Sequence, residues 1–181
     1  MTEAQAPSRS VIEPFDPDRH DRASFSCDLP QVDNLFKRTA SKLAKADKLR
    51  VYVMLGFGRE LIGFYALNAH AVDFADLPAK YVRTGAGHGS IPAAYISMIG
   101  VDERFQGRGI GGDLLIDGLH RIAFAADAIG IAVVMLDVLD CGDPDRVTQR
   151  ASLYEGYGFI PLAANPLRMI LPIATVRSLL A

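Results

Sequence analysis

The chain has 181 residues, of which 50% are hydrophobic and 22% are charged, and its formal net charge is −2. This is the composition of a globular protein whose length allows one sizeable core and is too short for two ordinary domains. The charge gives no support for general nucleic-acid binding, and the longest apolar run, residues 129–136, is far shorter than a membrane span.

The first ten residues are polar and lack the apolar core of a secretory signal, so we expect residues 1–10 to form a flexible N-terminal tail. Two cysteines, Cys27 and Cys141, are too few for a disulfide framework, and no Cys or His cluster has metal-ligand spacing. We therefore expect a cytoplasmic protein with no metal site and no membrane partner.

A helix is predicted first, because Asp28 is a suitable N-cap and Pro30 suits a first turn. Apolar residues then recur at helical spacing as far as Ala44. The opposite face carries five basic residues, namely Lys37, Arg38, Lys42, Lys45 and Lys48. That face is either a solvated surface or a patch for a polyanion or an acidic partner.

Strands dominate the middle of the chain. Residues 49–57 and 61–71 predict a hairpin, residues 77–90 a loop, and residues 93–101 a central strand. Residues 111–128 then carry an apolar stripe at helical spacing, and we expect Gly130 to end that helix in the left-handed conformation.

The C-terminal part predicts a β-branched strand at residues 131–139 and a polar excursion at 141–150. A short helix at 151–157 closed by Gly158 follows, and then a terminal strand pair at 159–162 and 167–171. Helix, hairpin, strand, helix, strand, helix and strand in this order predict one mixed α/β domain.

The segment Gln106–Gly112 is the most informative part of the sequence. Glycines let the backbone approach a ligand, and the free N–H groups of the next helix favour an anion such as phosphate. A Walker A loop is excluded because Asp113 follows where lysine is required.

A dinucleotide fingerprint also matches this loop, through Gly107, Gly109 and Gly112. Residues 102–106 nevertheless separate the strand from the first glycine, and Asp137 lies beyond the usual offset of about 20 residues. Too few residues follow to complete a doubly wound sheet, so we disfavour this interpretation.

A third interpretation is an acyl-coenzyme A loop. Gln106–Gly111 matches the Q/R-x-x-G-x-G/A signature of the GCN5-related N-acetyltransferases, and Ser152–Phe159 looks like their closing x-x-Y-x-x-x-G-F element. The chain resembles that superfamily. The resemblance implies an α/β fold with a mixed, mostly antiparallel sheet, splayed between the fourth and fifth strands and flanked by helices. One N-acetyltransferase domain would occupy residues 11–173, followed by a C-terminal extension at 174–181.

A narrower resemblance concerns the acetyltransferases of toxin–antitoxin systems. Phe25–Asp28 with Val32–Phe36 is similar to their F-x-C…L-D-x-aromatic-L opening, Gly63–Leu67 to their G-Y-Y-x-L strand, and Gly100–Asp102 to L-A-V-D. This implies charged tRNA as a substrate and an antitoxin as a partner. The chain departs from the pattern in lacking arginine before Gly100, in its longer segment 141–150 and in its net charge.

The reaction that the resemblance implies moves an acetyl group from acetyl-coenzyme A to a primary amine. The implied coenzyme-binding residues are Ile99 and Val101 for the pantetheine arm, and Gln106, Gly107, Arg108, Gly109, Ile110, Gly111 and Gly112 for the pyrophosphate. By its place in the closing element, Tyr154 is the implied catalytic residue and donates a hydrogen bond or proton to the leaving thiolate. The alternative is that Tyr154 only packs, which we expect of Tyr157.

No general base stands out. Asp102 and Glu103 end the central strand, and His88 lies in the loop that follows the hairpin. An aminoacyl amine has a pKa near that of a chain terminus, about 7.7–8.0, and needs little help to lose its proton.

Three functions therefore remain open. The first is an N-acetyltransferase acting on a small amine, a protein amine or aminoacyl-tRNA. The second is a toxin that acetylates charged tRNA and is neutralised by an antitoxin. The third is a non-catalytic acyl-coenzyme A-binding module. Dimers are common in the family, so a homodimer is also compatible with the resemblance.

Overall fold

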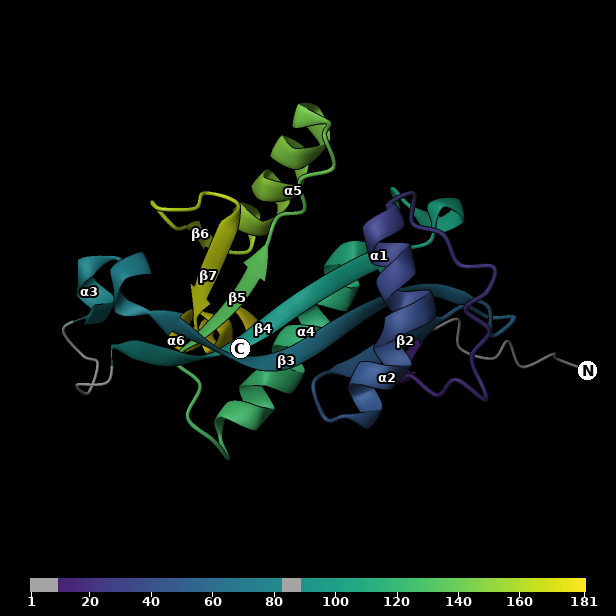
Figure 1. Cartoon of the computed structure of the whole chain (residues 1–181), viewed down its shortest axis with the longest axis horizontal. Coiled ribbons are helices and arrows are strands. Elements are labelled where there is room, and N and C mark those ends of the chain that lie inside the picture. The colour runs from purple at the N-terminus through teal and green to yellow at the C-terminus, as the bar shows by residue number, and fades with distance from the viewer. Residues whose placement is uncertain (1–9, 83–88) are drawn as a thin grey trace, which may run out of the picture. The chain divides into compact units, whose positions relative to one another are not determined.

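The computed structural model describes residues 10–82 and 89–181, and their strands form one seven-stranded sheet in the order β1-β2-β3-β4-β5-β7-β6 (Figure 1). β4 and β5 are parallel, whereas β1–β2, β5–β7 and β6–β7 are antiparallel. The predicted mixed, mostly antiparallel sheet is confirmed. The strands are β1 Val11–Pro14, β2 Arg50–Leu55, β3 Leu61–Asp73, β4 Ser90–Val101, β5 Val133–Asp137, β6 Ile160–Pro161 and β7 Arg168–Pro172.

Helices connect these strands, and residues 1–9 and 83–88, with His88, lie outside the described part of the chain. Where a loop was predicted at 77–90, the chain forms the helix α3 before residue 83. No described helix combines the length and apolar character needed to cross a bilayer. The helices are α1 Pro30–Asn34, a π-helical turn Leu35–Thr39, α2 Ala40–Lys45, 3-10 turns Phe74–Asp76 and Glu103–Phe105, α3 Ala79–Val82, α4 Ile110–Ala126, α5 Pro144–Gly156 and α6 Ile173–Leu180.

The chain divides into two compact units. The first unit contains Met1–Tyr65 and Ile99–Leu115, and the second contains Ala66–Met98 and Ile116–Ala181. β3, β4 and α4 run from one unit into the other. The glycine loop thus belongs to the first unit, and Tyr154 belongs to the second.

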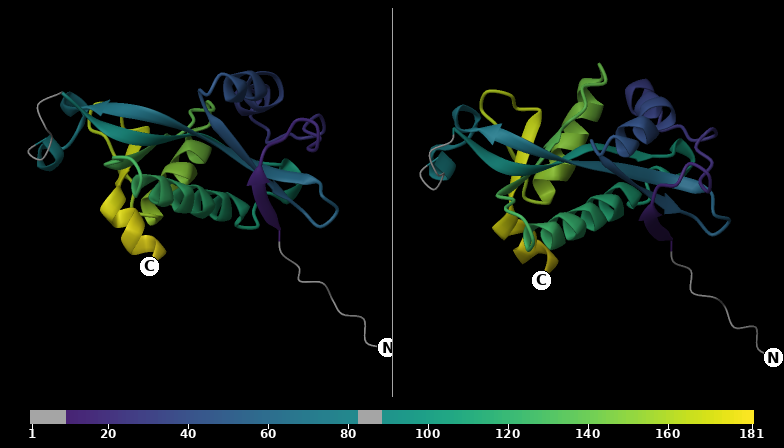
Figure 2. Two further views of the ribbon diagram at one scale, coloured as in Figure 1. Left: turned by 90° about the horizontal axis from the view of Figure 1, so that it is seen from below. Right: turned by 60° about the horizontal axis from the view of Figure 1, so that its bottom comes forward.

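Aromatic rings form the centre of the first unit, where α1 and α2 lie over β2 and β3 (Figure 2). Phe36 stacks on Phe64 with ring centroids 4.1 Å apart, and Phe25 meets both rings edge-on. A Cβ on Gly100 would lie 2.7 Å from the Phe64 ring and 3.2 Å from Val32, so α1 approaches the end of β4 as closely as glycine allows. This packing fixes where the glycine loop begins.

The predicted cap of α1 is wrong. Asp28 has a φ of 61°, so its backbone is left-handed, and Leu29 occupies the N-cap position without a side-chain hydrogen bond. Pro30 does stand in the first turn, as predicted. The carboxylate of Asp33 instead accepts the amide of Cys27 at 2.9 Å, so the side chain that orders this helix start lies inside the helix.

The core of the second unit is built around β5. Val133, Val134, Met135 and Leu136 are each at most 2% exposed, as expected of a central strand covered on both faces. α6 lies beside the C-terminal half of α4 (Figure 2), and an ion pair of 2.9 Å joins Arg177 of α6 to Asp127, the residue that follows α4. Residues 174–181, expected to be an extension, thus form most of α6.

The end of α4 also differs from the prediction. Gly130 does not adopt a positive φ, so it is not a left-handed cap. The helix instead ends in tight turns, in which the amides of Asp127 and Ala128 donate to carbonyls three residues earlier, at 3.2 and 3.0 Å. Those bonds satisfy the last carbonyls without a left-handed residue.

α5 is longer than predicted, and the expected polar excursion is wrong for residues 144–150. Asp143 is the N-cap, because its carboxylate accepts the amides of Asp145 and Arg146 at 3.1 and 3.2 Å, and Pro144 occupies the first turn. Gly158 has a φ of 94° and closes the segment as predicted. α5 is the element that carries Tyr154.

Candidate active site

The glycine loop joins the end of β4 to α4 through the turn Glu103–Phe105. Gly107 and Gly109 have φ values of 75° and 80°, which is the region that favours glycine, and a Cβ at either position would meet no atom within 4 Å. Glycine is therefore required here by backbone conformation, and the space beside the loop is open. Residues Gln106–Gly109 are all exposed, so the loop's backbone is accessible to a ligand.

Hydrogen bonds at both ends hold this loop in place, from a side chain at one end and from the backbone at the other. The Gln106 amide donates to the carbonyl of Val101 at 3.0 Å and to that of Cys27 at 3.2 Å. At the other end, the amides of Gly112 and Asp113 donate to the Gly109 carbonyl. The predicted pyrophosphate residues thus run from a turn, Gln106–Gly109, into the first residues of α4, Ile110–Gly112, and the Gly112 amide is already used within the helix.

Two arginines surround Phe105 on the surface of the loop. The guanidinium groups of Arg104 and Arg108 lie 5.5 and 5.4 Å from the centre of the Phe105 ring. Arg108 also donates to the Arg104 carbonyl at 3.3 Å, and its side chain is exposed. The loop thus carries an exposed cation at Arg108.

Asp102 is a structural residue rather than a free base. Its side chain is 1% exposed and accepts Arg104 Nε at 2.7 Å, Arg104 Nη2 at 3.0 Å and the amides of Arg104 and Ser26. Burial alone would raise the pKa of Asp102, but these hydrogen bonds outweigh it and lower the pKa. The neighbouring Glu103 is exposed.

Tyr154 is half-buried on α5, with its ring edge-on to Phe159 at a centroid distance of 6.0 Å. Burial raises the pKa of its phenol, and the positive charge of Arg150 one turn earlier opposes that rise only partly. The hydroxyl is therefore protonated at neutral pH, and it can donate a hydrogen bond but is a poor base. Ile99 and Val101, half-buried at the end of β4, belong to the first unit.

A polar network in the second unit was missed by the sequence analysis. Arg168 donates to both oxygens of Asp137, at 2.8 and 2.9 Å, and the Tyr95 hydroxyl donates to the same carboxylate at 2.8 Å. The edge of the His70 ring meets Tyr95 at 5.4 Å. Asp137 had been considered only as the acid of a dinucleotide fingerprint.

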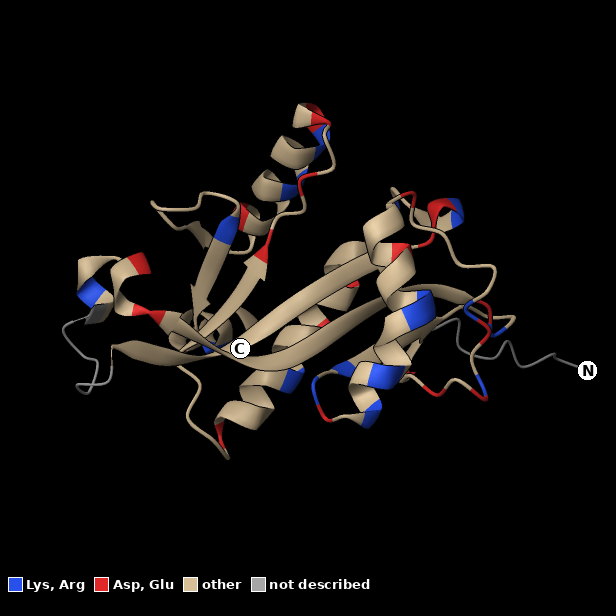
Figure 3. Ribbon diagram, in the orientation of Figure 1, with Lys and Arg blue, Asp and Glu red and all other residues tan. Residues whose placement is uncertain are grey.

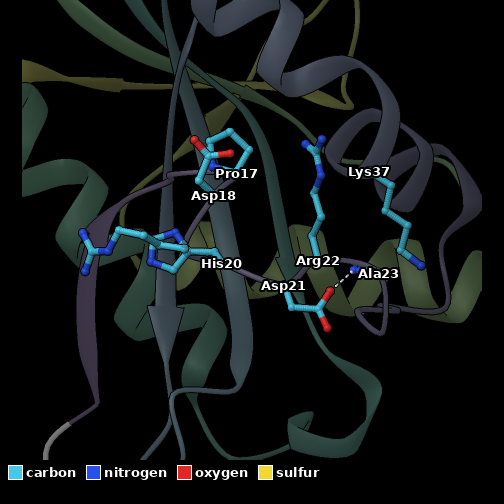
Figure 4. A pocket seen from close by; sticks show the side chains of 8 residues that line it. Pro17, Asp18, His20, Asp21, Arg22, Ala23 and Lys37 are labelled. Carbon is cyan, nitrogen blue, oxygen red and sulfur yellow. Dashed lines mark hydrogen bonds between the residues drawn. The ribbon is translucent and has the colours of Figure 1, made fainter.

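The described residues also form a surface pocket of about 580 Å³ in the first unit (Figure 4). His20 is buried beside it with both ring nitrogens occupied, since Nδ1 accepts the Asp16 amide at 2.9 Å and Nε2 donates to Glu13 at 2.8 Å. No group of metal-ligating side chains occurs in the described part of the chain. The pocket is lined by Pro17, Asp18, Arg19, His20, Asp21, Arg22, Ala23 and Lys37.

No family model matches the chain. Its sequence is 62% identical to a probable toxin TacT of Sinorhizobium fredii over 174 residues, which cover 96% of both proteins. The chain belongs to the TacT family of toxin-type acetyltransferases. The suspected superfamily and its toxin branch are thereby confirmed, and so is the prediction of an acyltransferase.

Other relatives of this TacT-family chain are more distant. A tRNA-acetylating toxin of Mycobacterium tuberculosis is 29% identical over 163 residues, which cover 90% of this chain and 92% of that protein. Solved structures share the fold, among them AtaT complexed with acetyl-methionyl-tRNAfMet, with a TM-score of 0.81, 21% identity and coverage of 96% and 100%. A tyrosine-to-phenylalanine mutant of KacT has a TM-score of 0.82, 20% identity and coverage of 94% and 98%.

In this TacT-family chain the toxin-type opening F-x-C…D contacts the start of the glycine loop. We call its residues Ser26, Cys27 and Asp33 the clamp. The Ser26 carbonyl accepts the Glu103 amide at 2.8 Å, and the Ser26 hydroxyl donates to Asp33 at 3.3 Å. Burial, followed by the hydrogen bond with Asp33, raises the pKa of the Cys27 thiol to about 12. The cysteine is thus a buried structural residue and not a nucleophile.

Proposed function

We propose that this protein transfers the acetyl group of acetyl-coenzyme A to the aminoacyl amine of a charged tRNA, and that it acts in the cytoplasm as a toxin neutralised by an antitoxin. The observation that carries the proposal is the 62% identity with a probable toxin over 96% of the chain. The more distant relative that is named for tRNA acetylation supports the acceptor. Neighbours of the same fold include AtaTR bound with acetyl-coenzyme A and AtaT bound to the C-terminus of the antitoxin AtaR.

The first unit supplies the coenzyme site in this proposal. The pyrophosphate would bind the exposed turn Gln106–Gly109 and the first, half-buried residues of α4, Ile110–Gly112, where open space faces Gly107 and Gly109, and Arg108 would add an ion pair. Helix-end and backbone donors of this kind suit phosphate. The pantetheine arm would run along the main chain of Ile99 and Val101 as an added strand. The Val101 carbonyl already accepts from Gln106, so it is not available to the coenzyme.

The chemistry requires the free amine to attack the thioester carbonyl carbon while the carbon–sulfur bond breaks. The electron pair leaves with sulfur as a thiolate, and the amine loses a proton. Full proton transfer from a phenol of pKa about 10 to a thiolate whose thiol has a pKa of about 8.5 is uphill by roughly 2 kcal/mol. Since burial raises the pKa of Tyr154 further, we infer that Tyr154 stabilises the thiolate by hydrogen bonding more than by protonating it.

The basic helix face suits a tRNA backbone. Arg38, Lys42, Lys45 and Lys48 are exposed and Lys37 is half-buried, and Figure 3 shows basic positions on the side of the π-helical turn and α2 that faces the viewer. Phosphate contacts supply most of the sequence-independent affinity for nucleic acid. This face supports tRNA over a small amine as the acceptor.

The test is release of coenzyme A thiol from acetyl-coenzyme A in the presence of charged tRNA, with uncharged tRNA, small amines and peptide N-termini as comparisons. Acetylated aminoacyl-tRNA and growth arrest on expression without a partner are expected. Tight coenzyme binding without thiol release from any acceptor would instead identify a non-catalytic binding module.

The catalytic assignment has its own test. Tyr154→Phe keeps the ring against Phe159 and removes only the hydroxyl, so we expect turnover to fall about 10²–10⁴-fold with unchanged coenzyme affinity. Tyr157→Phe is the matched control on the same segment. Equal turnover in wild type and Tyr154→Phe would remove Tyr154 from the mechanism.

A further inference from the structure

Four polar or aromatic side chains form a row across neighbouring strands of the second unit. His70 lies on β3, Tyr95 on β4, Asp137 on β5 and Arg168 on β7. Asp137 and Arg168 are direct register partners. Tyr95 is the register partner of Met135, which lies two residues before Asp137 on β5. The β4–β5 ladder ends at Ile96 and Leu136, so the row lies where these two strands stop pairing.

The row occupies the sheet face opposite Tyr154. Side chains alternate between the faces of a strand, so Arg168 shares a face with Ile170, and Asp137 shares it with Met135. Both apolar residues belong to the cluster against which Tyr95 and Ile160 also pack. Phe159 directly precedes Ile160, so alternation assigns it to the other face, and its ring is the one that Tyr154 contacts.

Hydrogen-bond directions define what the row offers a ligand. Arg168 and the Tyr95 hydroxyl both donate to Asp137, and the Tyr95 proton is thereby committed. The Tyr95 oxygen keeps its lone pairs, and Asp137 Oδ1 accepts only from Arg168 Nε in the described network, so the row presents acceptors. The Asp137 and Arg168 side chains are each 33% exposed, so a ligand can reach them.

The charge balance of the row favours a particular ligand. Hydrogen bonding by Arg168, against the opposing effect of burial, lowers the pKa of Asp137, which stays ionised. Burial and the bond to Asp137 raise the pKa of Tyr95 to about 12, so its phenol stays neutral. The pair Asp137–Arg168 then has no net charge. A neutral group of acceptors binds an amine N–H without favouring the ammonium form, which could not attack a thioester.

We infer that Tyr95, Asp137 and Arg168 form the subsite that receives the primary amine of the acceptor, on the sheet face opposite Tyr154. This inference rests on the proposed acetyl transfer and adds the residues that orient the nucleophile. Tyr95 contacts the amine, whereas Arg168 acts as a positioning residue by fixing Asp137. The partly buried apolar residues on the same face, Phe74, Tyr81 and Ile160, would adjoin the rest of an aminoacyl group.

The experiment is steady-state kinetics with charged tRNA and with acetyl-coenzyme A as the varied substrate. Tyr95→Phe removes one acceptor atom, so we expect kcat/KM for the acceptor to fall about 3- to 10-fold. Asp137→Asn also removes the negative charge that pairs with Arg168, so we expect kcat/KM for the acceptor to fall about 10- to 100-fold. The KM for acetyl-coenzyme A stays within about 2-fold in both, because that parameter reports a different substrate. Asp127→Asn, which breaks the exposed Asp127–Arg177 pair of the same unit, is the matched control with wild-type constants.

Each outcome decides the question. The subsite would be overturned if the KM for acetyl-coenzyme A rose in parallel with the loss of kcat/KM for the acceptor. It would also be overturned if kcat/KM for the acceptor did not fall. Should Asp137→Asn unfold, Tyr95→Phe decides alone, because it keeps the ring in its apolar contacts. If wild type acetylates a small amine but not charged tRNA, the proposed acceptor is wrong, and the same variants test the subsite on that amine. If wild type acetylates no amine, both proposals fail.

Discussion

Replacing Asp102 by asparagine tests whether a buried carboxylate holds the glycine loop. The 1% exposed side chain accepts four hydrogen bonds, three from Arg104 and one from the amide of Ser26. Asparagine keeps one acceptor oxygen. Its NH₂ group can only donate, so it cannot accept hydrogen bonds from the N–H groups that face it. Each buried hydrogen bond to a charged acceptor contributes about 1.5–3 kcal/mol. Water reaches the half-exposed Arg104, however, and its hydrogen bonds to the guanidinium offset part of that loss.

We therefore expect Asp102→Asn to lower the free energy of unfolding by about 2–3 kcal/mol, or the midpoint temperature by about 4–12 °C. Urea unfolding followed by circular dichroism measures this at pH 7, with Asp47→Asn, in the exposed Asp47–Arg50 pair, as the control. Because the pKa of Asp102 is lowered on folding, its contribution is present above the unfolded value of about 3.9 and is lost as pH falls through the folded value. The wild-type advantage should disappear below that range. A loss equal to that of Asp47→Asn at pH 7 would refute the role of the Asp102 carboxylate in holding the loop.

Three further predictions concern the loop, the catalytic helix and the cysteines. In Gly109→Ala the new Cβ meets no atom, but alanine is forced into a φ of 80°. We expect a loss of about 1–2 kcal/mol in the free energy of unfolding, measured in urea, and weaker coenzyme binding, measured by calorimetry. Unchanged values would contradict the strain. Asp143→Ala removes the cap of α5 and should cost about 0.5–2 kcal/mol, whereas a neutral result would show that the cap contributes nothing. A hydrogen bond from Arg150 lowers the pKa of Cys141, so iodoacetamide should label it in the native protein well before buried Cys27, as mass spectrometry would show; equal rates would contradict this order.

Local signals predicted the backbone of the glycine loop better than they predicted its surroundings. Gly107 and Gly109 must be glycine because of their own backbone angles, and those requirements are written in adjacent residues. The α5 start was equally local, since Asp143-Pro144 is a common helix beginning. It was missed because the mean polarity of the segment outweighed the capping signal.

Distant partners explain the rest of what the sequence could not predict. Asp137 and Arg168 are 31 residues apart, and only the β5–β7 register brings them opposite each other. Asp28 looked like the cap of α1, but Leu29 occupies that position, and the Asp33 carboxylate accepts the Cys27 amide that precedes the helix. In both cases the residue types were visible in the sequence and the pairing depended on tertiary structure.

If charged tRNA is the acceptor, as proposed, net charge is a weak guide to it, because salt limits the distance over which charges act. The chain carries 19 basic and 21 acidic residues, yet residues 37–48 contain five basic residues and one acid, Asp47. At physiological salt the field of an exposed charge decays over about 8 Å, so a phosphate on this helix face responds to the local excess and little to remote carboxylates. Long-range steering of tRNA should then be weak, and salt should weaken binding mainly through the few phosphates that this face neutralises. A nearly neutral acetyltransferase can in this way bind a polyanion without attracting nucleic acid in general.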